Sequence, residues 1–92
     1  MLKLPAELTI AKVEECKSTI IAATQEQDII VFDDSDVVRI DTVGIQMLLA
    51  SVTYIAAQNK ELQWQSTSTA IQESIKLLGI NEPILNQYLV SN

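Results

Sequence analysis

Apolar positions recur along the chain at two different intervals, and segments with the two intervals alternate. Spacings of three and four residues predict amphipathic helices at about residues 10–24 and 43–59, and a shorter helix that Gly79 ends. The apolar face of the first of these helices begins at Ile10. Between the first two, the run Ile29–Phe32 is apolar at every position, which is typical of a central strand covered on both faces. Residues 62–65 alternate between apolar and polar side chains and predict a strand with one solvent-exposed face.

Shorter elements are expected at the two ends of the chain, and two helix starts have candidate capping residues. Residues 2–4 predict an edge strand. Asn81 and Pro83 suit the start of a last turn or helix that carries apolar residues up to Leu89. Thr9 is a candidate N-cap for the first helix, and Thr69 has the capping-box spacing to a glutamine three residues later. The order strand, helix, strand, helix, strand, helix, helix predicts one α/β domain over residues 1–92. We expect a mostly parallel or mixed sheet of about four strands with three to four helices.

Composition narrows the possible functions. The chain has no histidine and a single cysteine, Cys16, so by itself it forms no internal disulfide, no Cys/His zinc site and no Ser-His-Asp centre. Cys16 lies on the apolar face of its helix and is expected to be a buried thiol. Six basic against twelve acidic residues, a net charge of −6, disfavour nucleic acid and an anionic membrane as partners. Without a membrane-length apolar run or a signal peptide, we expect a cytoplasmic protein. Because the chain has no nucleophile-and-base set and no Gly-rich phosphate loop, we expect it to be non-enzymatic and to have no cofactor.

Half of the acidic residues gather in about a sixth of the chain. Residues 26–41 hold six acids and one base, Arg39. Such a charge cluster would steer a partner that carries a basic groove. The turn at residues 33–36 lacks the loop length and closing glutamate of an EF-hand, so no metal site is expected there. The acids of the cluster are Glu26, Asp28, Asp33, Asp34, Asp36 and Asp41.

The segment Arg39–Ile45 joins an apolar stretch directly to the start of a helix. The first amides of a helix lack internal partners, so Asp41 or Thr42 can serve as an N-cap, with Gly44 easing the packing of the helix. The same geometry places the Thr42 hydroxyl at a helix start that favours anions. A phosphate on it would add a charge of about −1.5 to −2. The residues of this segment alone leave both interpretations open.

The helix at 43–59 carries a second apolar stripe opposite its core face, which is centred near Val52. A helix lying on a sheet normally has a polar outer face, so the stripe suggests a docking surface with Met47 and Tyr54 as anchors. Ordinary surface scatter, or a neighbouring helix that covers the stripe, is the alternative. Trp64 is expected in the core or at its rim. The stripe consists of Val43, Met47, Ala50, Tyr54 and Ala57.

The stretch from Val31 to Leu49 resembles the core motif of STAS domains, a family that includes the small anti-sigma factor antagonists and their relatives. That motif is an apolar strand, an acidic turn, a hydrophobic-Asp-Ser/Thr-x-Gly-hydrophobic segment and a leucine-rich helix. Two departures are a short N-terminus and a valine, Val43, where many members have a small residue. The matching segments are Ile29–Phe32, Asp33–Asp36, Ile40–Ile45, Met47–Leu49, and at the ends Leu8–Ile10 and Ile75–Ile80.

The resemblance implies a binding module switched by phosphorylation. In such proteins the unphosphorylated form binds a serine kinase that is also an anti-sigma factor; the kinase modifies the residue after the Asp, here Thr42, and a phosphatase reverses this. Other small STAS proteins are fixed subunits of lipid-transport ATPase complexes or act beside chemotaxis signalling proteins, and these remain alternatives. The expected partner-binding residues are Asp33, Asp34, Asp36, Asp41, Thr42, Val43, Gly44, Met47, Ala50 and Tyr54.

Overall fold

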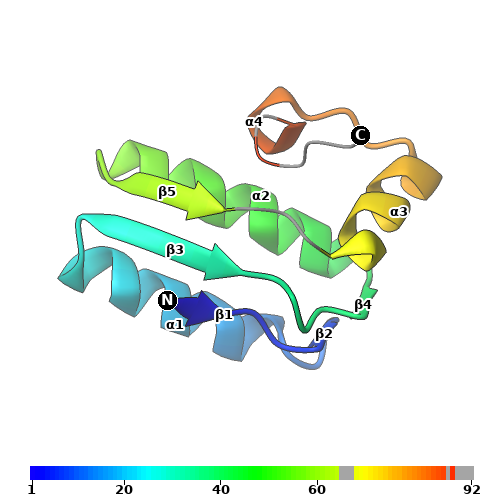
Figure 1. The fold of residues 1–92 in the computed structure, drawn as a ribbon, viewed down its shortest axis with the longest axis horizontal. Coiled ribbons are helices and arrows are strands. Elements are labelled where there is room, and N and C mark those ends of the chain that lie inside the picture. The colour runs from blue at the N-terminus through cyan, green and yellow to red at the C-terminus, as the bar shows by residue number, and fades with distance from the viewer. Residues whose placement is uncertain (65–67, 87, 89–92) are drawn as a thin grey trace.

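Short parallel strands alternate with helices along the chain. The computed structural model describes residues 1–64, 68–86 and 88. The α/β class and the parallel pairing of strands that the sequence predicts are confirmed. The elements follow in the order β1 (Leu2–Lys3), β2 (Glu7–Leu8), α1 (Val13–Glu26), β3 (Ile29–Asp33), β4 (Arg39–Ile40), α2 (Thr42–Ala57), β5 (Glu61–Trp64), α3 (Thr69–Leu78) and α4 (Pro83–Asn86) (Figure 1).

The described strands form two small sheets rather than the single sheet of about four strands that the sequence suggests. β3 lies between β1 and β5, and β2 pairs with β4. The amide of Leu4 still donates to the Asp33 carbonyl at 2.9 Å, but Pro5 has no amide hydrogen and interrupts the ladder. Beyond the interruption, the Val38 amide donates to the Ala6 carbonyl at 2.9 Å, and the second sheet begins.

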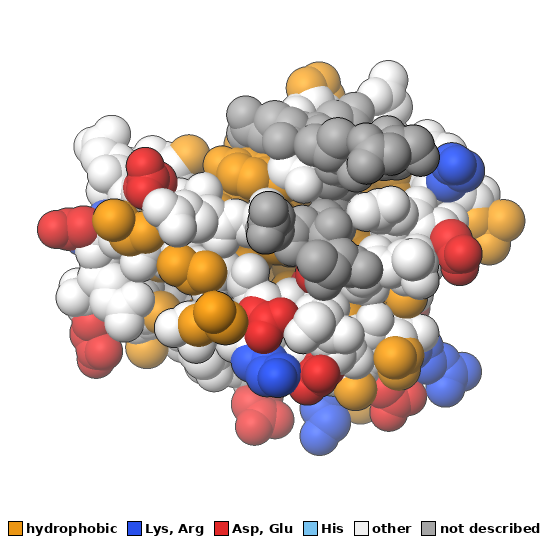
Figure 2. All heavy atoms as spheres, in the orientation of Figure 1, with side chains coloured by type: hydrophobic (Ala, Val, Ile, Leu, Met, Phe, Trp, Pro, Cys, Tyr) orange, Lys and Arg blue, Asp and Glu red, His pale blue; other side chains and the backbone are white. Residues whose placement is uncertain are grey.

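Helices cover one face of the three-stranded sheet. The chain passes from β1 to β3 to β5 in one direction across the sheet, and right-handed crossovers then place α1 and α2 on the same side (Figure 1). Ile30 and Phe32 point into that side and are 0% and 3% exposed, whereas Ile29 is 49% exposed. Figure 2 looks onto the open face and shows hydrophobic side chains over β3 and β1. The prediction that Ile29–Phe32 is covered on both faces is therefore wrong.

The core is closed by aromatic side chains at one end of the sheet. Trp64 is buried and makes an edge-on contact with Phe32, with ring centroids 5.6 Å apart. The ring of Tyr88 stacks on that of Trp64, with ring centroids 6.0 Å apart. Cys16 is buried as predicted, and burial, followed by the charge of Glu15, raises its pKa to about 11. The thiol therefore stays protonated and unreactive at neutral pH.

Two helix starts differ from the sequence pattern, one because of a local backbone turn and the other because of a tertiary contact. Thr9 accepts backbone hydrogen bonds from Lys12 and Val13 through its carbonyl, so residues 9–12 form a turn and α1 begins only at Val13. Ser68, not Thr69, caps α3: its hydroxyl accepts from the Ile71 amide at 3.3 Å and donates to the Val37 carbonyl at 2.8 Å.

The ends of the later elements follow the sequence pattern where the structure describes them. Gly79 ends α3 in the left-handed conformation with φ 67°, and α4 begins at Pro83, as predicted. The predicted positions at residues 65–67 and at Leu89 lie outside the described residues.

Candidate docking site at the start of α2

Asp41 is the N-cap of α2 and uses both oxygens of its carboxylate. Oδ1 accepts from the amide of Gly44 at 2.9 Å, and Oδ2 accepts from the amide of Ile10 at 3.2 Å. The first bond satisfies one of the free amides of the helix, which confirms the capping interpretation. The second bond ties the turn before α1 to the start of α2. Asp41 thus holds together two segments that are far apart in the sequence.

Gly44 allows α2 to pass close to the smaller sheet. A Cβ atom at this position would collide with the carbonyl oxygen of Leu8 and would lie 2.9 Å from Cγ1 of Ile40. The expected packing role of the glycine is confirmed. Because Gly44 is buried, its predicted role as a partner contact is wrong, and it acts by positioning the residues around it.

Thr42 is the first residue of α2, and its side chain is exposed. Val43 beside it is 37% exposed, and Ile10, which Asp41 holds in place, is 72% exposed. The sequence pattern places Ile10 on the buried face of the first helix, and the structure shows that this prediction is wrong. Since Ile10 precedes Val13 by a helical interval of three, no periodicity could have distinguished it from a core residue.

The acids of residues 26–41 do not form one continuous edge. Asp28 lies before β3, where it pairs with Lys60 at 2.9 Å, and Asp36 lies after β3, where it pairs with Lys3 at 3.5 Å. The strand separates the two groups by about 16 Å at 3.3 Å per residue. Asp34 is fully buried and accepts from the indole N–H of Trp64, so it is not a surface residue for a partner. The prediction of a single acidic docking edge is therefore wrong.

Asp33 keeps its negative charge at the carboxyl end of β3. The Ser35 hydroxyl and the Ser35 amide, the latter 3.0 Å from Oδ1, donate to its carboxylate, and the Lys3 ammonium lies 4.0 Å from Oδ2. These contacts hold the pKa of Asp33 below its usual value. Together with Asp36, whose side chain is 57% exposed, it leaves a smaller acidic surface at this end of the strand.

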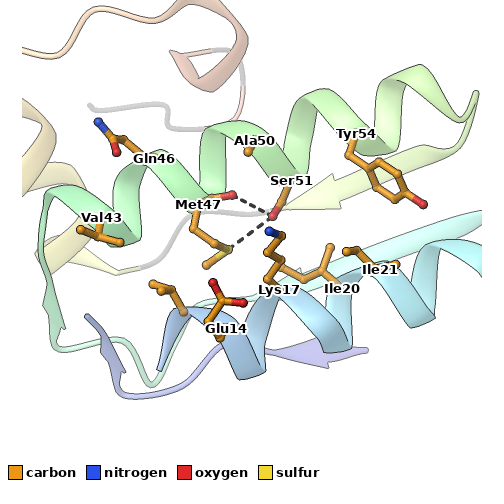
Figure 3. Close-up of a pocket in the computed structure, with 11 residues that line it drawn as sticks. Glu14, Lys17, Ile20, Ile21, Val43, Gln46, Met47, Ala50, Ser51 and Tyr54 are labelled. Atoms are coloured by element: carbon orange, nitrogen blue, oxygen red, sulfur yellow. Dashed lines mark hydrogen bonds between the residues drawn. The ribbon is translucent and has the colours of Figure 1, made fainter. Parts of the chain in front are cut away.

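A groove of about 410 Å³ runs between α1 and α2, and Val43, the residue after Thr42, is among the residues that line it (Figure 3). Met47 points from α2 toward α1 and is only 7% exposed, and the Ser51 hydroxyl donates to its carbonyl at 2.8 Å. For Met47, the alternative that a neighbouring helix covers the stripe is thus correct. Ala50 remains exposed and Tyr54 half-buried, so part of the stripe is accessible. The groove is lined chiefly by Val13, Ile20, Ile21, Val43, Met47 and Tyr54, with Glu14, Lys17 and Gln46 among its polar residues.

A family model described as Mlab, STAS domain matches residues 1–90. The chain belongs to the STAS domain family. No curated protein and no solved structure matches it. STAS domains are regulatory modules that mediate protein–protein interactions and are generally non-enzymatic. Within the described residues of this STAS domain, no helix combines the length and the apolar character that crossing a bilayer requires.

The STAS domain therefore presents a hydroxyl on a firmly held helix start. Asp41 holds the backbone at Ile10 and at Gly44 through two hydrogen bonds. Gly44 allows α2 to pack closely on β2. The apolar side chains of Ile10 and Val43 lie at the surface near the hydroxyl. The groove continues this surface along α2 toward Tyr54. Of the residues predicted as partner contacts, those still available at this surface are Asp41, Thr42, Val43, Ala50 and Tyr54.

Proposed function

We propose that this STAS domain binds a signalling protein in the cytoplasm through the start of α2 and the α1–α2 groove, and that phosphorylation of Thr42 releases the partner. The observation that carries the proposal is the exposed Thr42 side chain beside a carboxylate whose two oxygens are already occupied by backbone amides. A hydroxyl in this position is accessible to a kinase, and its modification changes the charge at the end of the docking surface where α2 begins.

The effect of a phosphate follows from the neighbours of Thr42. It would add about −1.5 to −2 charges next to Asp41, which cannot turn away without releasing the amides of Ile10 and Gly44. The phosphate is strongly hydrated, and a partner that contacts the neighbouring apolar side chain of Val43 would have to remove part of this hydration. Repulsion and desolvation then act together against a partner fitted to the unmodified surface.

The chemistry of the surface indicates the kind of partner. Asp33 and Asp36 leave negative charge at the carboxyl end of β3, and Tyr54 offers an aromatic anchor farther along α2. A partner of the kinase or anti-sigma type, with a basic patch beside an apolar pocket, fits both features. A phosphatase would restore the binding form by removing the phosphate.

A second candidate is a permanent subunit of a lipid-transport ATPase complex, without a phosphorylation switch. It is favoured by Asp41, whose two hydrogen bonds preorganise the start of α2 in the unmodified chain. The same docking surface would then be covered at all times. An adaptor beside chemotaxis proteins would use the surface in the same way.

Binding of the cognate partner to the wild type, Thr42→Ala, Thr42→Ser and Thr42→Glu tests the proposal. We expect Ala and Ser to bind and Glu to lose at least about tenfold in affinity, which corresponds to 1.4 kcal/mol. Thr53→Glu is the matched control, because Thr53 is exposed on the same helix. Equal binding by all variants would contradict a docking role for Thr42.

Intact-mass spectrometry of the protein from cells, with and without phosphatase treatment, separates the two candidates. A switch protein shows a phosphate that the phosphatase removes and that the Thr42→Ala variant lacks. A permanent subunit remains unmodified and copurifies with an ATPase. Copurification of an unmodified chain would overturn the switch and leave the docking surface intact.

A further inference from the structure

A second groove, the β4–α3 groove, lies between β4 and α3 and has a volume of about 710 Å³. Among the residues that the structure describes, it shares no lining residue with the α1–α2 groove. The hydroxyl of Ser68 at the start of α3 donates to the carbonyl of Val37 just before β4, at 2.8 Å. This bond fixes the helix to the strand, so the groove is formed before any partner arrives. Its lining includes Val38, Arg39, Ile40, Glu73, Lys76 and Leu77.

The β4–α3 groove is bordered by large apolar side chains that the described residues leave uncovered. Leu77 is 88% exposed and Val38 is 72% exposed, and Leu78 next to Leu77 is 48% exposed. Figure 2 shows hydrophobic side chains at the surface at the α3 end, next to basic and acidic ones. Single exposed apolar residues are common on protein surfaces, but a cluster around one groove is typical of an interaction site.

The charge of this groove is opposite in sign to that of the chain as a whole. Its lining has two bases, Arg39 and Lys76, and one acid, Glu73, whereas the whole chain has six bases and twelve acids. Arg39 also lies 3.5 Å from Glu7, with the side chains 73% and 54% exposed. An exposed pair of this kind is worth little, so the guanidinium can still engage an incoming carboxylate.

We propose that the β4–α3 groove docks an acidic segment of a partner protein, one that places apolar side chains between Val38 and Leu77 and carboxylates on Arg39 and Lys76. Charge complementarity selects this occupant. An acidic segment is repelled by most of the surface of a chain with net charge −6, and it finds a favourable potential only where bases outnumber acids. This interaction does not depend on Thr42 or on the proposed switch.

Fluorescence anisotropy with a labelled peptide about four helical turns long, with leucine and glutamate at helical spacing, tests the proposal. Two matched peptides replace every glutamate by lysine or every leucine by serine. We expect the acidic apolar peptide to bind and both matched peptides to bind at least about tenfold more weakly. Leu77→Ser and Lys76→Glu should each weaken binding by about tenfold, and Lys12→Glu by less than about twofold.

The controls keep the proposal falsifiable. Lys12 is an exposed lysine outside the groove, so its variant carries the same change of net charge. Since Leu77 and Lys76 are exposed, their variants should fold, which circular dichroism checks. Equal binding of the acidic and basic peptides, or no effect of Leu77→Ser, overturns the proposal. So does binding of phosphatidylglycerol vesicles without the peptide, or self-association in the wild type that Leu77→Ser abolishes.

Discussion

The indole N–H of Trp64 donates a hydrogen bond of 3.2 Å to the carboxylate of Asp34, which is fully buried. This bond joins the end of β5 to the turn after β3. Asp34 therefore has a structural role, whereas Asp33 and Asp36, the other two acids of that turn, remain available at the surface.

Replacing Asp34 by alanine should destabilise the fold. The substitution removes the carboxylate that accepts the buried Trp64 N–H, and the loss of a buried acceptor costs about 1–3 kcal/mol. Asp36→Ala is the matched control and should stay within about 0.5 kcal/mol, because that side chain is exposed. Urea unfolding followed by Trp64 fluorescence measures both. Equal midpoints for the two variants would contradict a structural role for Asp34.

Replacing Gly44 by alanine should move α2 away from β2. The added methyl group meets the backbone carbonyl of Leu8, which cannot rotate aside, and overpacking of this kind costs about 1–3 kcal/mol or more. Gly79→Ala meets no atom within 4 Å, and its cost comes from its positive φ alone, about 1–2 kcal/mol. Thermal unfolding should rank Gly44→Ala as the more destabilising of the two. The reverse order would show that the contact between α2 and β2 is easily relieved.

Replacing Asp41 by alanine should release the turn before α1 as well as the start of α2. Loss of an N-cap costs about 0.5–2 kcal/mol, and the amide of Ile10 loses its acceptor at the same time. Hydrogen exchange measured by NMR should therefore become faster at both Gly44 and Ile10. Thr42→Ala, at the adjacent exposed position, should leave both amides protected. Faster exchange at Gly44 alone would show that the Ile10 bond does not hold the turn.

Cys16 should make stability depend on pH in the alkaline range. Burial raises its pKa from 9.0 to about 11, so the folded state binds the proton more tightly than the unfolded state does. Its contribution is complete below pH 9.0 and is lost as the pH rises toward about 11. Urea unfolding at a series of pH values, compared with Cys16→Ala, isolates this slope. Parallel slopes in the two proteins would contradict the raised pKa, and so would alkylation of native Cys16 as fast as in urea.

The identity and order of most elements could be predicted from the sequence, because periodicity and caps depend on residues within one segment. Leucine and isoleucine spacing locates α2 almost to its ends, and the positive φ of Gly79 follows from its place after the last apolar position of α3. In the candidate site, the capping role of Asp41 could be predicted for the same reason, because Asp41 directly precedes the helix that it caps.

Exposure was determined only by the tertiary structure, because it depends on which distant segment covers a side chain. Ile10 and Met47 each occupy an apolar position at helical spacing, yet Ile10 lies at the surface and Met47 beneath α1. Asp34 and Asp36 are chemically alike and two residues apart, but only Asp34 meets Trp64, thirty residues later in the chain. The sequence thus determined most of the elements and the place of Thr42 at the start of α2. The fold decided which of the surrounding residues a partner can reach.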